Sequence, residues 1–151
     1  MSPAKFMRII NLWPPLLFSG IHVISFDRDM RRVEVGLRLT WWNHNWVGTQ
    51  FGGNIYSMTD PFYPLMLRAN LGPEYVIWDE SAHIHFITPG RTKLRARFIL
   101  SKEKLDEIRA GTASDRKFLA EFSVEILDVN DTLIARVDKV IYVRPKQSVK
   151  A

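Results

Sequence analysis

Cysteine is absent from the 151-residue sequence. This absence excludes disulfide bonds, zinc sites with cysteine ligands and a thiol nucleophile, and it fits the reducing cytoplasm. The chain also lacks internal repeats and low-complexity segments. We therefore expect one cytoplasmic domain over residues 1–151, because a chain of this length buries roughly 70% of its unfolded surface and needs no covalent staples.

Long apolar runs are missing as well. The N-terminal segment has two basic residues ahead of an apolar patch, which Asn11 and the Pro14-Pro15 pair interrupt. A patch of about a dozen residues is too short for a membrane span and makes a poor signal peptide. We expect residues 1–20 to be a helical segment packed on the domain, with a short helix over 4–12 that the prolines end.

Acidic residues are outnumbered by basic ones, since 16 Asp and Glu stand against 21 Lys and Arg. The net charge is +5 and the sequence pI is near 9.7. A basic surface attracts polyanions such as nucleic acids, coenzyme A and acidic carrier proteins. No Arg/Gly-rich tail, zinc-finger spacing or RNA-binding strand motif accompanies the charge, so nucleic-acid binding is the weakest interpretation. A solvated basic surface is the simplest one.

Alternating apolar residues predict an antiparallel sheet of about six strands. The clearest pattern runs over 33–40, where alternate residues are apolar and indicate one buried face. Residues 21–27 form a hairpin with this strand across 28–31. The other expected elements are strands over 75–88, 92–100, 117–128 and 133–144, with a turn at Asn130-Asp131, and a short helix over 102–110 that Ser101 caps and Gly111 closes.

The apolar stretch from Gly52 to Leu71 is long enough for one central helix. A helix that is apolar all round must be wrapped, and the surrounding antiparallel sheet is the only candidate. Pro61 and Pro64 lack N–H groups, so an unbroken helix is costly here. A kink at Asp60 is compatible with the pattern, and Asp60 would then cap a second helical segment over 62–70. We predict an α+β fold.

The stretch from Asn45 to Asp60 carries the most informative chemistry. Gly52 and Gly53 leave backbone N–H groups unobstructed at the positive end of a helix dipole, which suits a phosphate, a carboxylate or a developing oxyanion. Asp60 follows Gly53 by seven residues, on nearly the same helix face but about 10 Å along the axis. One chain cannot easily present both groups to one carbonyl carbon. A symmetric dimer that brings them together is the simplest solution.

Each residue of this stretch also has a plain structural role open to it. Asn45 can close a turn with its side chain. Gly48 and Thr49 can fix the loop, and Asp60 can act as a helix cap. The residues alone leave these alternatives open.

The string Asn45-x-x-Gly48-Thr49-x-Phe51-Gly52-Gly53, followed by Asp60, resembles the signature of hotdog-fold acyl-CoA thioesterases of the phenylacetate-pathway type. An uncharacterised bacterial branch of that superfamily is closer still, on the run from Gly52 to Tyr63 together with Trp78-Asp79 and Thr88-Pro89-Gly90. The resemblance implies a hotdog fold and hydrolysis of acyl-CoA or acyl-carrier-protein thioesters. We expect a dimer or a dimer of dimers, with no cofactor and no metal.

The resemblance also implies roles for single residues. Gly52 matches the glycine whose N–H stabilises the thioester oxyanion, and Asp60 matches the carboxylate that activates water or attacks the thioester. Asn45 matches a residue that positions the water or the substrate carbonyl. Phe51 departs from the family pattern, because these thioesterases usually carry His there. Loss of one positioned donor slows a reaction about 10²–10³-fold, so a slow enzyme, an altered substrate or an acyl-CoA- or lipid-binding protein without turnover stay open.

Further candidates lie outside the helix. The substrate-binding candidates are Thr49, Phe51, Gly53, Asp79, Ser81 and Arg91. Four cations from Arg91 to Arg97 share one face of a strand, which predicts either a solvated outer face or a contact with a phosphate or an acidic carrier protein.

Histidines and tryptophans complete the set of candidates. His83 and His85 are expected on one side of a strand with Ser81 and Asp79, and no third ligand stands at a recognisable metal spacing. Most aromatic residues are expected in the core. The alternatives for Trp41, Trp42 and Trp46 are the wall of an acyl pocket or a dimer interface.

Overall fold

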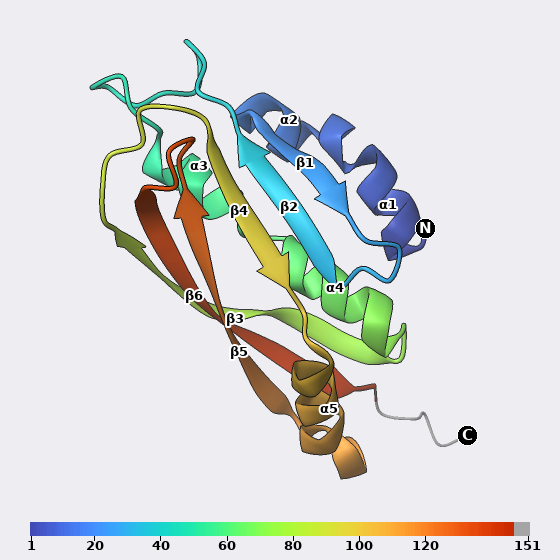
Figure 1. Ribbon diagram of the computed structural model, residues 1–151. Helices are drawn as coiled ribbons and strands as arrows, with labels where there is room; N and C mark the ends of the chain where they lie inside the picture. Colours follow the sequence, from blue (N-terminus) through green and yellow to red (C-terminus); the bar gives the residue numbers. More distant parts are fainter. Residues whose placement is uncertain (147–151) are drawn as a thin grey trace.

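The computed structural model describes residues 1–146 and shows an α+β fold, in which a curved antiparallel sheet wraps two consecutive helices (Figure 1). The strand order is β1-β2-β4-β5-β6-β3. This is the hotdog arrangement, so the predicted fold class and strand number are confirmed. The strands are β1 (Ile21–Phe26), β2 (Arg32–Leu37), β3 (Tyr75–Phe86), β4 (Leu94–Ile99), β5 (Phe118–Leu127) and β6 (Leu133–Pro145).

Within residues 1–146, five α-helices and two 3₁₀ turns accompany the sheet. They are α1 (Pro3–Ile9), η1 (Ile10–Leu12), α2 (Pro14–Ser19), α3 (Gly52–Ser57), α4 (Phe62–Leu71), α5 (Lys102–Gly111) and η2 (Ala113–Asp115). The first helical stretch ends before the proline pair as predicted, but Pro14 also begins α2, because proline at the first helical position loses no helical hydrogen bond. None of the described helices has the length and apolar character needed to span a membrane.

The central helical stretch is two helices, α3 and α4, rather than one unbroken helix. The break follows the kink expected at the prolines, because Pro64 has no N–H for the carbonyl of Asp60 four residues earlier. Helix α3 closes with tight turns, in which Thr59 N–H donates to Tyr56 O at 2.8 Å. The cap position of α4 is Pro61, without a side-chain cap. The alternative role of Asp60 as the cap of this helix is therefore wrong.

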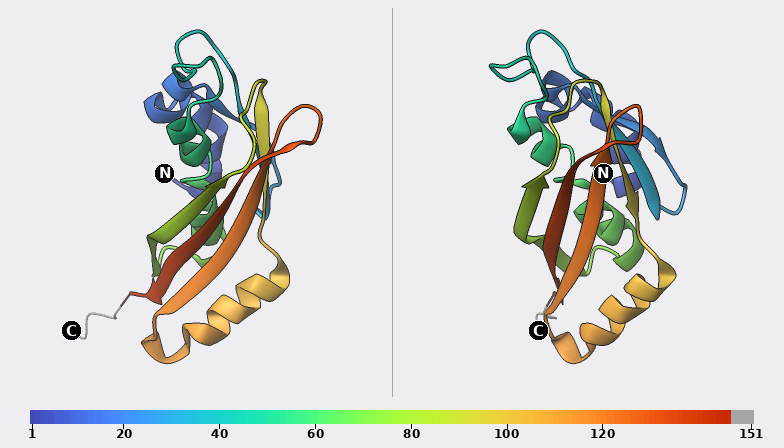
Figure 2. Two further views of the ribbon diagram at one scale, coloured as in Figure 1. Left: turned by 90° about the vertical axis from the view of Figure 1, so that its left-hand side faces the viewer. Right: turned by 60° about the vertical axis from the view of Figure 1, so that its left-hand side comes forward.

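The core lies between the concave face of the sheet and helices α3 and α4 (Figure 2). Aromatic rings join the two layers: the ring centroids of Tyr63 on α4 and Phe122 on β5 are 4.2 Å apart, and those of Phe62 and Phe98 are 5.1 Å apart. Phe62 and Phe98 are fully buried. This packing fixes α4 on the sheet, and with it the segment that carries Asp60.

A β-bulge in β3 changes which side chains face the core. Asp79 pairs with Ile141 of β6, whereas Ser81 pairs with Val140, so the register shifts by one residue between them. A bulge of this kind reverses the in-and-out alternation of a strand. The expectation that Asp79 and Ser81 lie on one side of the strand is therefore wrong: Asp79 shares the inner face with Ile141, and Ser81 lies on the outer face with His83.

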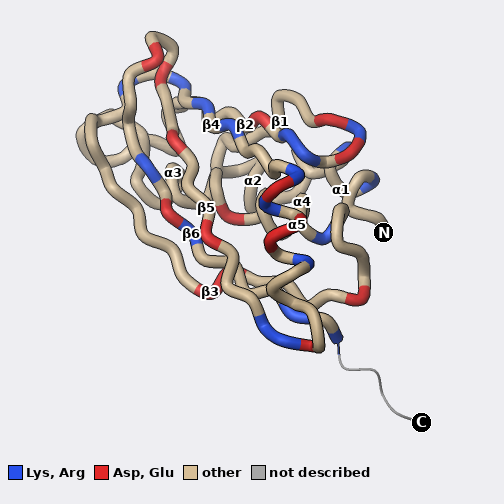
Figure 3. Tube along the Cα trace, turned by 60° about the horizontal axis from the view of Figure 1, so that its bottom comes forward, with Lys and Arg blue, Asp and Glu red and all other residues tan. Residues whose placement is uncertain are grey.

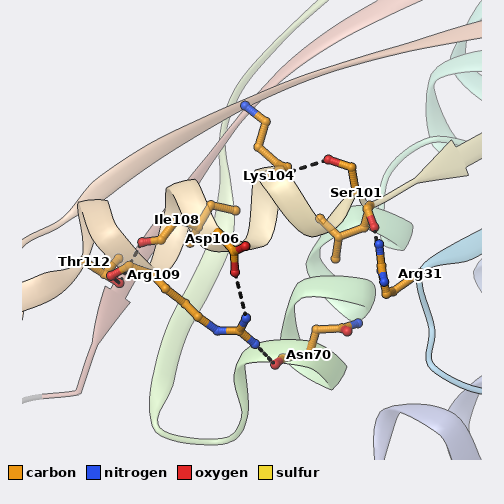
Figure 4. A network of polar contacts seen from close by, with 9 residues as sticks. Arg31, Asn70, Ser101, Lys104, Asp106, Ile108, Arg109 and Thr112 are labelled. Carbon is orange, nitrogen blue, oxygen red and sulfur yellow. Dashed lines mark hydrogen bonds and ion pairs between the residues drawn. The ribbon is translucent and has the colours of Figure 1, made fainter.

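Helix α5 is tied to α4 and to the β1–β2 turn by polar contacts (Figure 4). Arg109 donates to the carbonyl of Asn70 at 3.2 Å, and the Asn70 side-chain nitrogen donates to the carbonyls of Asp29 at 3.1 Å and Met66 at 2.9 Å. Ser101 caps α5 as predicted, accepting from the backbone N–H of Lys104. Asn70 therefore links the end of α4 to a turn that is distant in sequence.

Replacing Asn70 with alanine tests this link. Because the substitution removes donors from backbone carbonyls, we expect Asn70→Ala to lower the free energy of unfolding by about 1–3 kcal/mol. Urea unfolding followed by circular dichroism measures the change. Asn130→Ala, at an exposed turn position, is the matched control, and an equal loss in both variants would contradict the assigned role.

Candidate active site

A pocket of about 470 Å³ lies at the start of α3. Its walls come from the loop over 45–50, from Gly52 and Ile55 of α3 and from the segment 86–91 that ends β3 and continues beyond it. The structure thus brings four predicted site residues to one pocket: Asn45, Thr49, Gly52 and Arg91. The other predicted residues do not line it; they are Phe51, Gly53, Asp60, Asp79 and Ser81.

Two aromatic rings explain why glycine occupies both positions at the start of α3. A Cβ on Gly52 would lie 3.1 Å from the Phe86 ring, and a Cβ on Gly53 would lie 2.6 Å from the Phe51 ring. Any larger residue at 53 would displace Phe51. In the described part of the chain, the N–H groups of Gly52 and Gly53 donate to no acceptor, as is typical of the first turn of a helix.

Asn45 holds the loop that leads into the pocket. Its side-chain oxygen accepts from the backbone N–H groups of Val47 at 3.1 Å and Thr49 at 3.0 Å. Its side-chain nitrogen donates to the Thr49 hydroxyl at 2.8 Å and to the Gln50 carbonyl at 3.4 Å. The Asn45 side-chain amide therefore makes these hydrogen bonds within the loop. Its contribution to the pocket is the shape of that loop.

A second polar cluster lies at the far end of α3, around Asp60. Lys139 of β6 is 1% exposed, and its ammonium donates to the carbonyls of Thr59 at 3.1 Å and Asp60 at 2.9 Å. The same ammonium donates to Asp79 Oδ2 at 3.1 Å. Asp60 itself is exposed. The cluster therefore joins the exposed residue Asp60 to an ion pair between the buried Lys139 and the half-buried Asp79.

Sequence reasoning missed Lys139, although the sequence contains a signal for it. Residues 135, 137, 141 and 143 of β6 are apolar and buried, and Lys139 falls on the same inward phase of the alternation. A charge at an inward position of a strand is costly unless it is paired. It therefore marks a partner on a neighbouring element.

Burial raises the pKa of the Asp79 carboxyl above its usual range, and the nearby Asp60 adds to this rise. The Lys139 ammonium opposes it by attracting the ionised form. Burial, followed by the charges of Asp60 and Asp79, also raises the pKa of the Tyr56 hydroxyl on α3. The groups around the helix break are therefore electrostatically coupled.

Basic and acidic residues are interspersed along the course of the chain (Figure 3). Within the predicted cation row, Arg95 pairs with Asp131, and Arg97 lies 3.9 Å from Glu34. The alternating residues Leu94, Ala96 and Phe98 are buried, so the row lies on the outer face of the sheet. This arrangement matches the solvated outer face that was one of the two alternatives.

The remaining candidates lie on exposed surfaces. The ring centroids of His83 and His85 are 4.4 Å apart, and His85 lies 3.5 Å from Asp138. In the described part of the chain, no group of three or more His, Cys, Asp or Glu side chains is placed to hold a metal ion. Trp41, Trp42 and Trp46 are not core residues, since they are 82%, 56% and 100% exposed.

Comparison with solved structures places this fold among proteins that include thioesterases. A protein of unknown function from Pseudomonas aeruginosa, titled a probable thioesterase, is 13% identical, with a TM-score of 0.78 over 95% of this chain and 93% of that one. A thioesterase from Haemophilus influenzae is 12% identical, with a TM-score of 0.70 over 98% and 94%. The E. coli PaaI protein of the phenylacetic acid degradation operon is 15% identical, with a TM-score of 0.64 over 95% and 93%.

At these identities the likeness is one of fold. A search of curated proteins finds no match. A protein-family model matches residues 4–143, nearly the whole chain. The protein therefore has the hotdog fold of its thioesterase neighbours and belongs to the family described as "Domain of unknown function (DUF4442)".

Proposed function

We propose that the protein hydrolyses thioesters of coenzyme A or acyl carrier protein in the cytoplasm. The observation that carries this proposal is the division of one candidate site between the two ends of α3. Free glycine N–H groups and a pocket lie at one end, and the exposed carboxylate of Asp60 lies at the other. An oxyanion binder and a general base are the two parts that acyl transfer to water requires.

A second copy of the chain completes the site in this proposal. Strand β3 is an outer strand of the sheet, twelve residues long, with one edge that no described strand covers. Such an edge offers backbone N–H and C=O groups for pairing with another chain. In a symmetric dimer, the Gly52 N–H of one protomer polarises the thioester carbonyl while Asp60 of its partner activates water or attacks the carbonyl carbon.

The pocket residues supply binding and orientation. Asn45 and Thr49 hold the loop beside Gly52 through their mutual hydrogen bonds. Arg91 is exposed at the pocket wall, and its planar guanidinium suits a phosphate of coenzyme A or of a carrier-protein prosthetic group. Apolar walls at Ile55 and Phe86 suit an acyl chain.

A binding protein without turnover is the second candidate, and Phe51 favours it. The ring is 52% exposed and lies against Gly53, at the position where the resembling thioesterases usually carry His. An apolar ring supplies no hydrogen bond to a substrate carbonyl. This candidate predicts saturable binding of an acyl-CoA with no release of thiol.

The role of Asp60 is tested by thiol release from a panel of acyl-CoA substrates. We expect the wild type to release thiol and Asp60→Asn to lower kcat by about 10²–10⁴-fold, because the amide is a poor base and nucleophile. Asp115→Asn, an equally conservative change at an exposed site on η2, is expected to match the wild type. Equal rates for the wild type and Asp60→Asn would remove Asp60 from the mechanism, and binding without any release would favour the second candidate.

The role of the Gly52 N–H is tested by a matched pair of substitutions. Gly52→Pro removes the N–H and fits the first position of a helix, while the preceding Phe51 already has the extended ψ of 126° that proline requires. Gly52→Ala adds the same Cβ against Phe86 but keeps the N–H. We expect Gly52→Pro to have a kcat about 10²–10³-fold below that of Gly52→Ala. Equal kcat values in the two variants would exclude this N–H as an oxyanion donor.

Mixing two inactive variants tests whether the site is shared between protomers. Each hybrid dimer of Asp60→Asn with Gly52→Pro has one composite site in which both groups are intact. Random exchange after mild denaturation and refolding is then expected to restore about one quarter of wild-type activity. If Gly52 and Asp60 of the same chain form the site, the mixture stays inactive.

A further inference from the structure

Lys139 is the one charged side chain among residues 1–146 that is buried from solvent. Its three N–H donors face three acceptors, the carbonyls of Thr59 and Asp60 and the carboxylate of Asp79. Burying an ammonium costs several kcal/mol, and an apolar side chain often stabilises a core at least as well as a buried ion pair. The fold alone therefore does not account for a lysine at this position.

The acceptors of Lys139 show what it controls. Pro64 cannot donate to the Asp60 carbonyl, and the Thr59 carbonyl also lies in the break between α3 and α4. The ammonium bonds both, and so holds the peptide groups on the two sides of the Asp60 Cα. The direction of the Asp60 side chain depends on that backbone.

The charges around this backbone are balanced by the same ammonium. Four titratable groups meet here: Tyr56 from α3, Asp60 from the break, Asp79 from β3 and Lys139 from β6. Without the ammonium, two neighbouring carboxyl groups would oppose each other's ionisation. The ammonium counters this effect by attracting the ionised form of Asp79, whose pKa burial raises.

We infer that Lys139 is a positioning residue for Asp60: it locks the helix break that carries Asp60 and orders Asp79, so that the Asp60 carboxylate is held at its exposed position beside Asp79. The catalytic consequence rests on the proposed thioesterase function. The structural consequence, a locked helix break, does not.

Lys139→Met tests the inference, because methionine keeps an unbranched chain and removes the donors and the charge. Arg136→Met is the matched control, since it removes one cation from an exposed, outward position of the same strand. We expect Lys139→Met to lower kcat about 10²-fold with little change in KM, as is typical when a reacting group is misplaced by about 1 Å. Arg136→Met should keep the wild-type kcat.

The titration of Asp79, followed by the NMR signal of its carboxyl carbon, separates the loss of the ammonium from a general loss of stability. Removing the ammonium removes the interaction that lowers the pKa of Asp79, so Asp79 is expected to take up its proton at higher pH in Lys139→Met. Arg136→Met should keep the wild-type titration. An Asp79 titration at the wild-type position in Lys139→Met would contradict the electrostatic part of the inference.

Amide hydrogen exchange decides the question independently of any activity. We expect faster exchange of the Thr59 and Asp60 amides in Lys139→Met, with no change in Arg136→Met. If the wild type hydrolyses no acyl-CoA, the proposed function fails while this measurement still tests the lock. Wild-type exchange rates at both amides in Lys139→Met would overturn the inference.

Should Lys139→Met not fold, Lys139→Gln takes its place. Glutamine keeps one donor group without the charge, and the same changes are expected.

Discussion

Backbone carbonyls that lose their helical partners must find other donors when they are buried, and this requirement organises the centre of the protein. Pro64 has no N–H to donate to the Asp60 carbonyl. The Thr59 carbonyl also lies in the break between the two helices. Strand β6 supplies the donor as Lys139. A buried ammonium needs a counter-charge, which Asp79 provides from the inner face of β3, directly before the bulge that turns Ser81 to the outer face. A proline on one element and a bulge on another are thus parts of one arrangement.

The two ends of α3 are built by opposite physical means. At its start, aromatic rings lie close to Gly52 and Gly53, so the position of the backbone depends on the close packing that these two residues allow by having no side chain. At its end, the geometry depends on charges and hydrogen bonds around Lys139. The six-residue helix holds these two environments at a fixed separation. The first is sensitive to added volume, whereas the second is sensitive to lost charge and to pH.

The sequence predicted those parts of the fold that follow from local patterns. The alternation that begins at Val33 and the Ser101 cap depend on neighbouring residues, so they could be predicted, although the strand expected over 33–40 ends at Leu37 in the structure. The bulge at Asp79 could not be read, because it is defined by pairing with a strand about 60 residues away. The partners of Lys139 were hidden for the same reason. A lysine at an inward position shows that a partner exists, but only the tertiary fold shows which one.

The candidate site was predictable in composition and less so in geometry. Gly52, Asn45 and Thr49 come together as their closeness in sequence suggests, and Arg91 joins them through the turn after β3. The tryptophans of the 41–47 loop were assigned mainly to the core by hydrophobicity alone, yet their side chains are exposed. Hydrophobicity predicts burial only where packing elements surround the chain, and this loop extends beyond the sheet.

The bulge in β3 also bears on how distant relatives are to be aligned with this chain. In a strand without a bulge, a gapless alignment preserves which residues face inward along its whole length. Here the two halves of β3 have opposite parity around residue 80. Consider a gapless alignment of β3 with a relative whose strand has no bulge. If this alignment matches Asp79 to the correct face, it assigns the residues from Ser81 onward to the wrong face, and a one-residue gap is needed to correct them. At identities of 12–15%, acidic residues of two relatives are therefore better matched by the face of the sheet on which they lie than by their spacing in the sequence.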